Sequence, residues 1–257
     1  MSMTIEALIL SAAMAAAAGL VGCFAVMRRM ALAGDALSHV ALPGIGIALA
    51  LHVHPVFGAT AMLFFGALVV WAIEDRSRLA TETIIGVIFS AALAVGSLVT
   101  SGEDLIEALF GGAGAAPSRL ETVFGLVAAV GVMLFVLRRK HALVVALVSP
   151  DIARTVGINV QRLNLLYLEM FALTVALGLR YLGVLLMGSL IIIPAATAKR
   201  LSGNLNQMLA TAAVIAVAVT VAGSVMASSM HRATGPIIVS LAAAGFFLSF
   251  FVAERDA

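Results

Sequence analysis

The chain has 257 residues, of which 63% are hydrophobic and only 11% are charged, and its formal net charge is +2. A soluble domain of this size could not keep so much apolar surface away from water, so the composition is typical of a membrane protein with several spans. It excludes a disordered chain, and the lack of basic runs with interleaved aromatic residues indicates no nucleic-acid partner. We expect the single cysteine, Cys23, to be a small buried packing residue, because one thiol supplies neither a disulfide framework nor a thiolate metal cage.

Nine apolar segments are long enough to cross a bilayer as helices, which satisfy their own backbone groups in lipid. They fall at 5–27, 31–53, 56–73, 82–100, 120–137, 163–180, 182–198, 207–229 and 235–252. The first segment has the small residues of a signal peptide, but its leading part contains Glu6 and no Lys or Arg, so we expect it to be retained. About nine transmembrane helices are therefore predicted, or eight if the pair around Gly183 does not form two spans. The prediction is an all-α polytopic membrane protein with a single transmembrane domain over 1–257.

The basic residues predict the orientation of these spans. If the segment RRKH at 138–141 is a cytoplasmic loop, alternation places most Lys and Arg residues on the same side. Three basic residues remain outside: Arg119, Arg180 and Arg232. Such a bias predicts an external N-terminus and a cytoplasmic C-terminus. The outer loop SGEDLIEAL at 101–109 then forms an acidic mouth that attracts cations.

A long cytoplasmic loop is predicted between the fifth and sixth spans, at 141–162, and it contains the signature of a short helix over about 149–157. That signature is an N-cap, a proline in the first turn, an acidic residue at the positive end of the helix dipole and a terminating glycine, here Ser149, Pro150, Asp151 and Gly157. Such a helix is either a docking surface for another protein or a connector that lies on the membrane.

Two ionisable residues, Asp35 and His39, lie inside the second apolar segment, in RRMALAGDALSHVALPG at 28–44. Each costs at least about 2.5 kcal/mol at the bilayer centre, and their i, i+4 spacing places them on one helix face. An oxygen and a nitrogen ligand suit zinc, and manganese or ferrous iron less selectively, in an incomplete site that an ion can leave. Alternatively, the two side chains bond to each other and only fix the helix to a neighbour. Pro43 and Gly44 are expected to kink or open the helix and to free carbonyls toward a cavity.

The remaining ionisable residues give weaker candidates. His52 and His54 flank the outer end of the second span, where they are either ligands at the mouth or solvated side chains. Glu169, in the sixth span, is expected to pair with a polar group of the helix bundle, and His231 is a weaker mouth candidate.

Motifs that are missing limit the function. Neither Lys140 nor Lys199 has the context of a phosphate-binding loop, and no HExxH or nucleophile motif is present. The chain is therefore not expected to be an enzyme, and any ATP-driven function requires a separate chain. Three classes remain: a subunit of an ATP-driven transporter, a carrier coupled to a proton or sodium gradient, and a structural membrane protein. A carrier would be expected to contain inverted repeats, and we find none.

Four blocks together resemble the permease subunits of metal-type ABC importers, and look most similar to the permease of high-affinity zinc uptake. They lie at 28–44, 148–162, 182–200 and 233–247, in the family's order and spacing. The resemblance covers nearly the whole chain and implies a type II ABC importer-like permease in a bacterial cytoplasmic membrane. It implies a homodimer that works with a cytoplasmic ATPase and a periplasmic or surface-tethered metal-binding protein. The imported ion would be zinc, or alternatively manganese or ferrous iron, with no permanently bound cofactor and with ATP acting only through the partner.

The resemblance also implies residue roles. The coupling helix that fits the ATPase would use four matching residues: Pro150, Asp151, Ala153 and Gly157. Asp35 and His39 would contact the ion in transit, and Pro194, in IIIPAATA, would line the translocation path. Pro43 and Gly44 are expected beside the same path, because they follow Asp35 and His39 within the span. The chain departs from the family pattern in the shortened segment 109–118 and at Glu169, which takes the place of an aliphatic residue.

Overall fold

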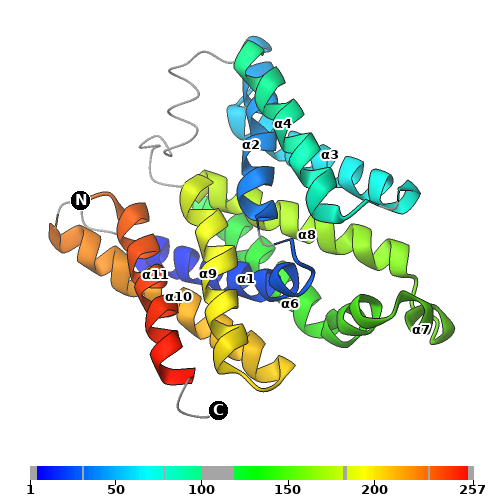
Figure 1. The fold of residues 1–257 in the computed structure, drawn as a ribbon. Helices are drawn as coiled ribbons and strands as arrows, with labels where there is room; N and C mark the ends of the chain where they lie inside the picture. The colour runs from blue at the N-terminus through cyan, green and yellow to red at the C-terminus, as the bar shows by residue number, and fades with distance from the viewer. Residues whose placement is uncertain are drawn as a thin grey trace.

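The computed structural model describes residues 5–30, 32–77, 79–99, 119–181, 184–230 and 232–253. Every regular element in these residues is a helix, and Figure 1 shows their arrangement. The helices are α1 (Ile5–Met27), α2 (Ala33–Ala50), α3 (Pro55–Arg76), α4 (Thr81–Val99), α6 (Arg119–Val148), α7 (Pro150–Thr155), α8 (Val160–Tyr181), α9 (Val184–Leu201), α10 (Leu205–Met230) and α11 (Thr234–Ala253). The prediction of an all-α architecture is confirmed.

Eight helices in the described residues are long and apolar enough to cross a membrane: α1, α2, α3, α4, α6, α8, α10 and α11. The helix α9 corresponds to the predicted segment 182–198 and is not one of these eight. Leu182 and Gly183, which precede it, lie outside the described residues. The most apolar stretches of α1 and α2 are largely buried, whereas most residues in those of α4, α6 and α11 are half-buried or exposed and suited to contact with lipid.

The prediction of a loop at RRKH is wrong. Residues 138–141 lie inside α6, which continues to Val148, so only 149–159 separate α6 and α8, and the short helix α7 lies within that stretch. The charges end the apolar segment but not the helix, because Arg, Lys and Ala are strong helix formers and no proline or glycine intervenes before Pro150. Long basic side chains can also reach water from the end of a spanning helix.

The core forms around α1, which packs against α9 and α10 through small residues. A Cβ added at Gly19 would lie 2.8 Å from the carbonyl oxygen of Ala212 in α10, and one at Gly22 would overlap that of Ile191 in α9. Small residues let helices approach closely, and this supplies much of the packing between membrane helices. Cys23 is fully buried at this contact, as predicted.

A second group of helices, α2, α3 and α4, stands beside this core (Figure 1). The prediction that Pro43 and Gly44 open the second span is wrong, because α2 continues as a helix through both residues. Gly44 instead forms a close helix crossing, since a Cβ added there would overlap the carbonyl oxygen of Gly58 in α3. Gly96 of α4 approaches the same part of α2, where its Cβ would lie 3.0 Å from that of Leu42. The three helices therefore pack as one unit.

We predict that Gly44→Ala destabilises the protein, because the added methyl group would force α2 and α3 apart. Such overpacking typically costs about 1–3 kcal/mol. The thermal unfolding midpoint of the purified protein in detergent, followed by the fluorescence of Trp71, should fall by several degrees. Gly86→Ala in α4 is the matched control, because nothing lies within 4 Å of a Cβ added at that position. Equal midpoints for the two variants would contradict the tight crossing.

Candidate functional site

The structure places Asp35 and His39 in the first two turns of α2, on one face of the helix. Asp35 is exposed on the surface of the single chain, whereas His39 is half-buried. In the part of the chain that the structure describes, the two salt bridges are Arg28–Glu74 and Asp151–Arg154, so Asp35 has no ion pair there. The buried Nδ1 atom of His39 likewise has no hydrogen-bond partner among the described residues. If Asp35 and His39 only held helices together, they would be expected to form a hydrogen bond to each other. No such bond through Nδ1 of His39 is formed within the described residues.

The surroundings of this pair come from α4 and α9. The His39 ring meets the Phe89 ring of α4 edge to face, with the ring centroids 5.3 Å apart. This contact supports one side of the imidazole without using either ring nitrogen. Gly188 of α9 lies against the backbone of Asp35, because a Cβ added at Gly188 would be 3.3 Å from the Asp35 nitrogen. The backbone of α2 thus packs on α9 at this point, while Asp35 stays exposed.

The three proposed pathway-lining residues have different surroundings. Pro43 and Gly44 are buried in α2, and Gly44 packs against α3 at the crossing described above. Pro194 is buried inside α9, where proline leaves one helix carbonyl without its usual amide donor. None of the three is exposed on the surface of the single chain, so their place beside a path stays a prediction.

His52 and His54 lie in the turn between α2 and α3, and both are exposed. His54 is the N-cap of α3, and its Nδ1 atom accepts a hydrogen bond from the Val56 amide at 3.4 Å. His52 adopts a left-handed backbone conformation, with φ of 54°. At about 1.5 Å per residue, this turn is about 25 Å along α2 from Asp35. The two histidines therefore belong to a separate location and do not complete the site at Asp35 and His39.

The predicted helix at 149–157 is present as α7, Pro150–Thr155. The Ser149 hydroxyl accepts a hydrogen bond from the Ile152 amide at 3.3 Å, and Pro150 occupies the first turn. Gly157 has φ of 82°, which favours glycine. The Gly157 and Ile158 amides bond to the carbonyls of Arg154 and Ala153, so the helix ends in a Schellman motif.

One side of α7 is buried against the protein and the other is exposed. Ala153 is fully buried, while Asp151 and Arg154 form an exposed ion pair at 3.1 Å. Three exposed apolar residues accompany them, and sequence analysis missed their role: Val148, Ile152 and Val156. Val148 ends α6, while Ile152 and Val156 are spaced by four residues within α7 and its C-cap, a spacing that indicates one apolar helix face. An apolar face on a fixed, exposed helix is suited to contact with another protein.

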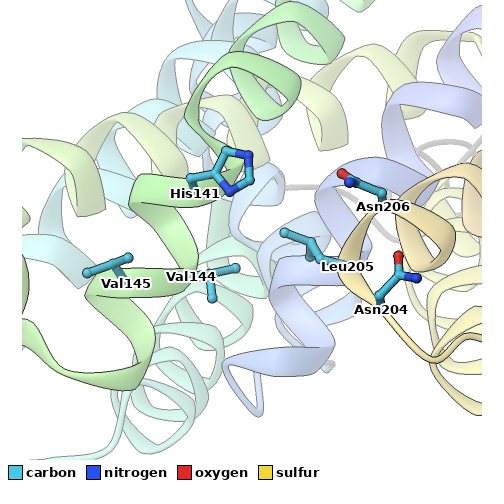
Figure 2. A pocket seen from close by; sticks show the side chains of 6 residues that line it. All are labelled: His141, Val144, Val145, Asn204, Leu205 and Asn206. Atoms are coloured by element: carbon cyan, nitrogen blue, oxygen red, sulfur yellow. The ribbon is translucent and has the colours of Figure 1, made fainter.

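A hollow of about 470 Å³ lies between α6 and the start of α10 (Figure 2). His141 of α6 lies across it from Asn204 and Asn206, and Lys140 next to it donates a hydrogen bond to Asn206 at 2.6 Å. His141 is the one titratable side chain in its lining. The lining of this hollow therefore does not gather metal ligands, and the Lys140–Asn206 hydrogen bond beside it links α6 to α10.

Several sequence predictions concern other positions. Glu169 is half-buried in α8, and its Oε2 atom is buried without a hydrogen-bond partner among the described residues. His231, the acidic segment 101–109 and the shortened segment 109–118 lie outside the described residues. No group of three or more His, Cys, Asp or Glu side chains that could hold a metal ion occurs in the described part of the chain.

The fold and the α2 pair define a polytopic helical membrane protein with an open acidic and imidazole pair in one span. The chain belongs to the ABC 3 transport family, whose model matches residues 1–253. It is 30% identical to the high-affinity zinc uptake system membrane protein ZnuB of Haemophilus influenzae, with 91% of each chain covered. It is 32% identical to the manganese transport system membrane protein MntC of Halalkalibacterium halodurans, over 93% of this chain and 83% of the relative. The structure of PsaBC from Streptococcus pneumoniae in complex with Fab matches with a TM-score of 0.80 and 28% identity, over 96% of this chain and 90% of that chain.

We predict that Ser149→Ala weakens α7, because the Ile152 amide loses its acceptor. Loss of an N-cap costs about 1 kcal/mol, which corresponds to about fivefold faster local opening. Amide hydrogen exchange of residues 151–157 measures this change. Ser149→Asn is the control, since Asn caps as well as Ser and should leave exchange near the wild-type rate. Equal exchange in Ser149→Ala and the wild type would contradict the capping role.

Proposed function

We propose that the chain is the permease subunit of a bacterial ABC importer that brings a divalent transition metal, zinc in the first place, into the cytoplasm. It would act as a homodimer in the cytoplasmic membrane, with a separate cytoplasmic ATPase and a periplasmic or surface-tethered metal-binding protein. Membership of the ABC 3 transport family and the metal transport named for its relatives support this proposal. The chain itself performs no covalent reaction.

The observation that carries the proposal is the open pair on α2. Asp35 presents a carboxylate at the surface of the single chain, and His39 lies one turn further along the same face. A charge in a spanning helix is costly, so one that lacks an ion pair within the described residues is suited to a transient cationic ligand. Two ligands hold an ion weakly, which suits transport because the ion must leave again. In a homodimer, a second copy of the pair could complete the coordination.

The ligand chemistry favours zinc over the other candidates. A neutral imidazole together with a carboxylate binds zinc more tightly than ferrous iron or manganese in the general affinity order for nitrogen and oxygen sites. Manganese is the second candidate, because relatives that transport it are as similar to this chain as those that transport zinc. Ferrous iron remains the third. The metal-binding protein would add its own selectivity before the ion reaches the permease.

The exposed helix α7 supports the partnership with an ATPase. Its capped ends and buried Ala153 fix its position, while Ile152 and Val156 offer an apolar surface with the charged pair Asp151 and Arg154 beside it. In the proposed cycle, the metal-binding protein delivers an ion to the outer mouth. ATP turnover in the partner then moves α7, and the path opens alternately outward and inward around Asp35 and His39.

We expect the double variant Asp35→Asn, His39→Ala to abolish metal uptake, because it removes both ligands while leaving the helix intact. The measurement is ATP-dependent uptake of radioactive zinc into proteoliposomes that contain the permease, the ATPase and the binding protein. Unlabelled zinc should compete better than manganese or ferrous iron, and the reverse order would assign the transport to the better competitor.

The control for this variant is Glu82→Gln, which neutralises an exposed carboxylate in the first turn of α4. It should transport zinc at the wild-type rate. The double variant should still co-purify with the ATPase, which shows that its fold is intact. Normal uptake by the double variant would remove Asp35 and His39 from the path, and uptake driven by a proton gradient without ATP would refute the ABC mechanism.

We expect Asp151→Arg to weaken co-purification of the ATPase. The change places a positive charge at the positive end of the α7 dipole and beside Arg154, at a cost of about 1 kcal/mol and thus about fivefold in affinity. Glu82→Arg reverses a charge at the same kind of position in α4, outside α7, and should leave recovery unchanged. Unchanged recovery with Asp151→Arg would contradict the docking role of α7.

A further inference from the structure

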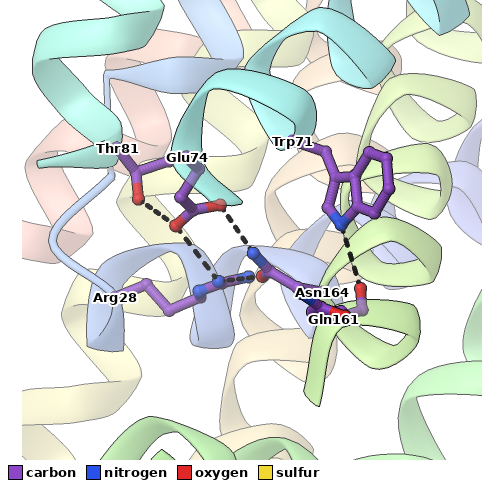
Figure 3. Close-up of polar contacts among 6 residues, drawn as sticks. All are labelled: Arg28, Trp71, Glu74, Thr81, Gln161 and Asn164. Carbon is purple, nitrogen blue, oxygen red and sulfur yellow. Dashed lines mark hydrogen bonds and ion pairs between the residues drawn. The ribbon is translucent and has the colours of Figure 1, made fainter. Parts of the chain in front are cut away.

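A cluster of polar contacts joins the end of α3 and the starts of α4 and α8 to Arg28, the residue that follows α1 (Figure 3). Glu74, in the last turn of α3, is its centre. The Asn164 amide of α8 donates to Oε2 of Glu74 at 2.5 Å, and the Thr81 hydroxyl at the start of α4 donates to Oε1 at 2.5 Å. The Arg28 guanidinium lies 3.8 Å from Oε1 and also donates to the Asn164 side-chain oxygen. Arg28, Glu74 and Asn164 therefore form a closed triangle of contacts.

The cluster is shielded from water more than a surface ion pair. The side chains of Arg28 and Glu74 are only 19% and 20% exposed. The guanidinium carbon of Arg28 also lies 5.0 Å from the centre of the Tyr167 ring, and the Tyr167 hydroxyl donates to the Val21 carbonyl at 3.1 Å. A charged pair in such a place is more strongly coupled than one in water, and removing one partner leaves the other without compensation. Movement of one member is therefore transmitted to the others.

Two residues of this cluster lie close in sequence to α7 and α2: Asn164 follows α7, and Arg28 precedes α2. Asn164 lies in the first turns of α8, and α8 begins only five positions after α7 ends. At the other side, Arg28 follows α1 directly, and Asp35 lies seven positions further along the chain. The intervening turn is tight, because Met30 is fully buried and its amide bonds to the Ala25 carbonyl at 2.9 Å. The helix that carries Glu74, α3, also crosses α2 at the close contact of Gly44 described above.

We propose that Glu74 is a positioning residue that couples movement of α7 and the start of α8 to α2, by holding Asn164 and Arg28 at the same carboxylate. This inference rests on the proposed function, since it concerns how ATP turnover in the partner reaches Asp35 and His39. Glu74 touches neither the ion nor the ATPase in this role. Its loss separates the two activities of the transporter, so that ATP hydrolysis continues while fewer ions cross for each ATP consumed.

The test uses the assembled transporter in proteoliposomes and measures ATP hydrolysis and uptake of radioactive zinc in the same sample. Glu74→Gln removes the charge that pairs with Arg28 but keeps the shape of the side chain. We expect the number of zinc ions taken up per ATP to fall about tenfold, as for loss of a hydrogen bond to a charged group, while the rate of ATP hydrolysis stays within twofold. Asn164→Ala removes only the link to α8 and should lower the same ratio.

A compensating variant separates coupling from simple loss of stability. In the double variant Glu74→Gln, Asn164→Asp the carboxylate moves from α3 to α8. There it can still pair with Arg28 and accept a hydrogen bond from the side-chain amide introduced at position 74. This double variant should restore the ratio of uptake to hydrolysis to within about threefold of the wild type.

The matched control is Asp75→Asn, which removes the neighbouring charge. Asp75 is exposed and accepts a hydrogen bond from Gln161 at 2.6 Å. Asparagine can accept the same hydrogen bond through its side-chain oxygen, so the ratio of uptake to hydrolysis should not change.

Three results would overturn the proposal: an unchanged ratio in Glu74→Gln, a parallel loss of hydrolysis and uptake, or no recovery in the double variant. If Glu74→Gln does not assemble, Asn164→Ala and the double variant give the same decision. Failure of the proposed function has a different signature, because the wild-type assembly would then show no ATP-dependent uptake of zinc, manganese or ferrous iron.

Discussion

Ionised side chains are costly to hold away from water, and this chain treats its partly shielded charges in two opposite ways. Arg28 and Glu74 neutralise each other, and Asn164 and Thr81 satisfy the Glu74 oxygens. Asp35 has no ion pair within the described residues, although it lies in a spanning helix. The paired charges of Arg28 and Glu74 fix helices relative to one another. The unpaired carboxylate of Asp35 would instead be stabilised by binding a cation. The contrast separates the supporting part of the molecule from the part that we propose to meet the ion.

Local signals predicted much of the fold. The first span was expected at 5–27, and α1 is Ile5–Met27. The agreement follows because a segment that crosses lipid must be long, apolar and helical, so that its backbone groups bond to one another. The ends of α7 were also predictable, since an N-cap and a terminating glycine act within a few residues. The error at 138–141 has the same physical origin. Charge marks where a chain leaves lipid, but a helix ends only where its hydrogen bonds do.

Contacts between distant residues were beyond sequence reasoning. Glu74 and Asn164 are 90 residues apart, and nothing in their local sequence distinguishes them from solvated polar residues near a span. Gly44 likewise gave a plausible but wrong expectation of an opened helix, because a glycine that breaks a helix and one that admits a neighbouring backbone look alike in sequence. For the candidate site, spacing placed Asp35 and His39 on one face, while their exposure and the support from Phe89 required the structure. Their contact with an ion stays a prediction.

The packing of α2 determines which movements can reach the pair. A carbonyl of Gly58 in α3 occupies the space that a side chain at Gly44 would need, so α2 cannot slide along α3 without a clash between backbones. On α9, a Cβ added at Gly188 would lie 3.3 Å from the nearest atom of α2, whereas one added at Gly44 would lie 2.2 Å from α3. The contact of α2 with α9 is therefore looser than its contact with α3 and resists movement less. A rigid group of α2, α3 and α4 that shifts against α9 would change the surroundings of Asp35 while keeping His39 against Phe89 of α4. Alternating access requires that the surroundings of one ligand change while the two ligands stay together.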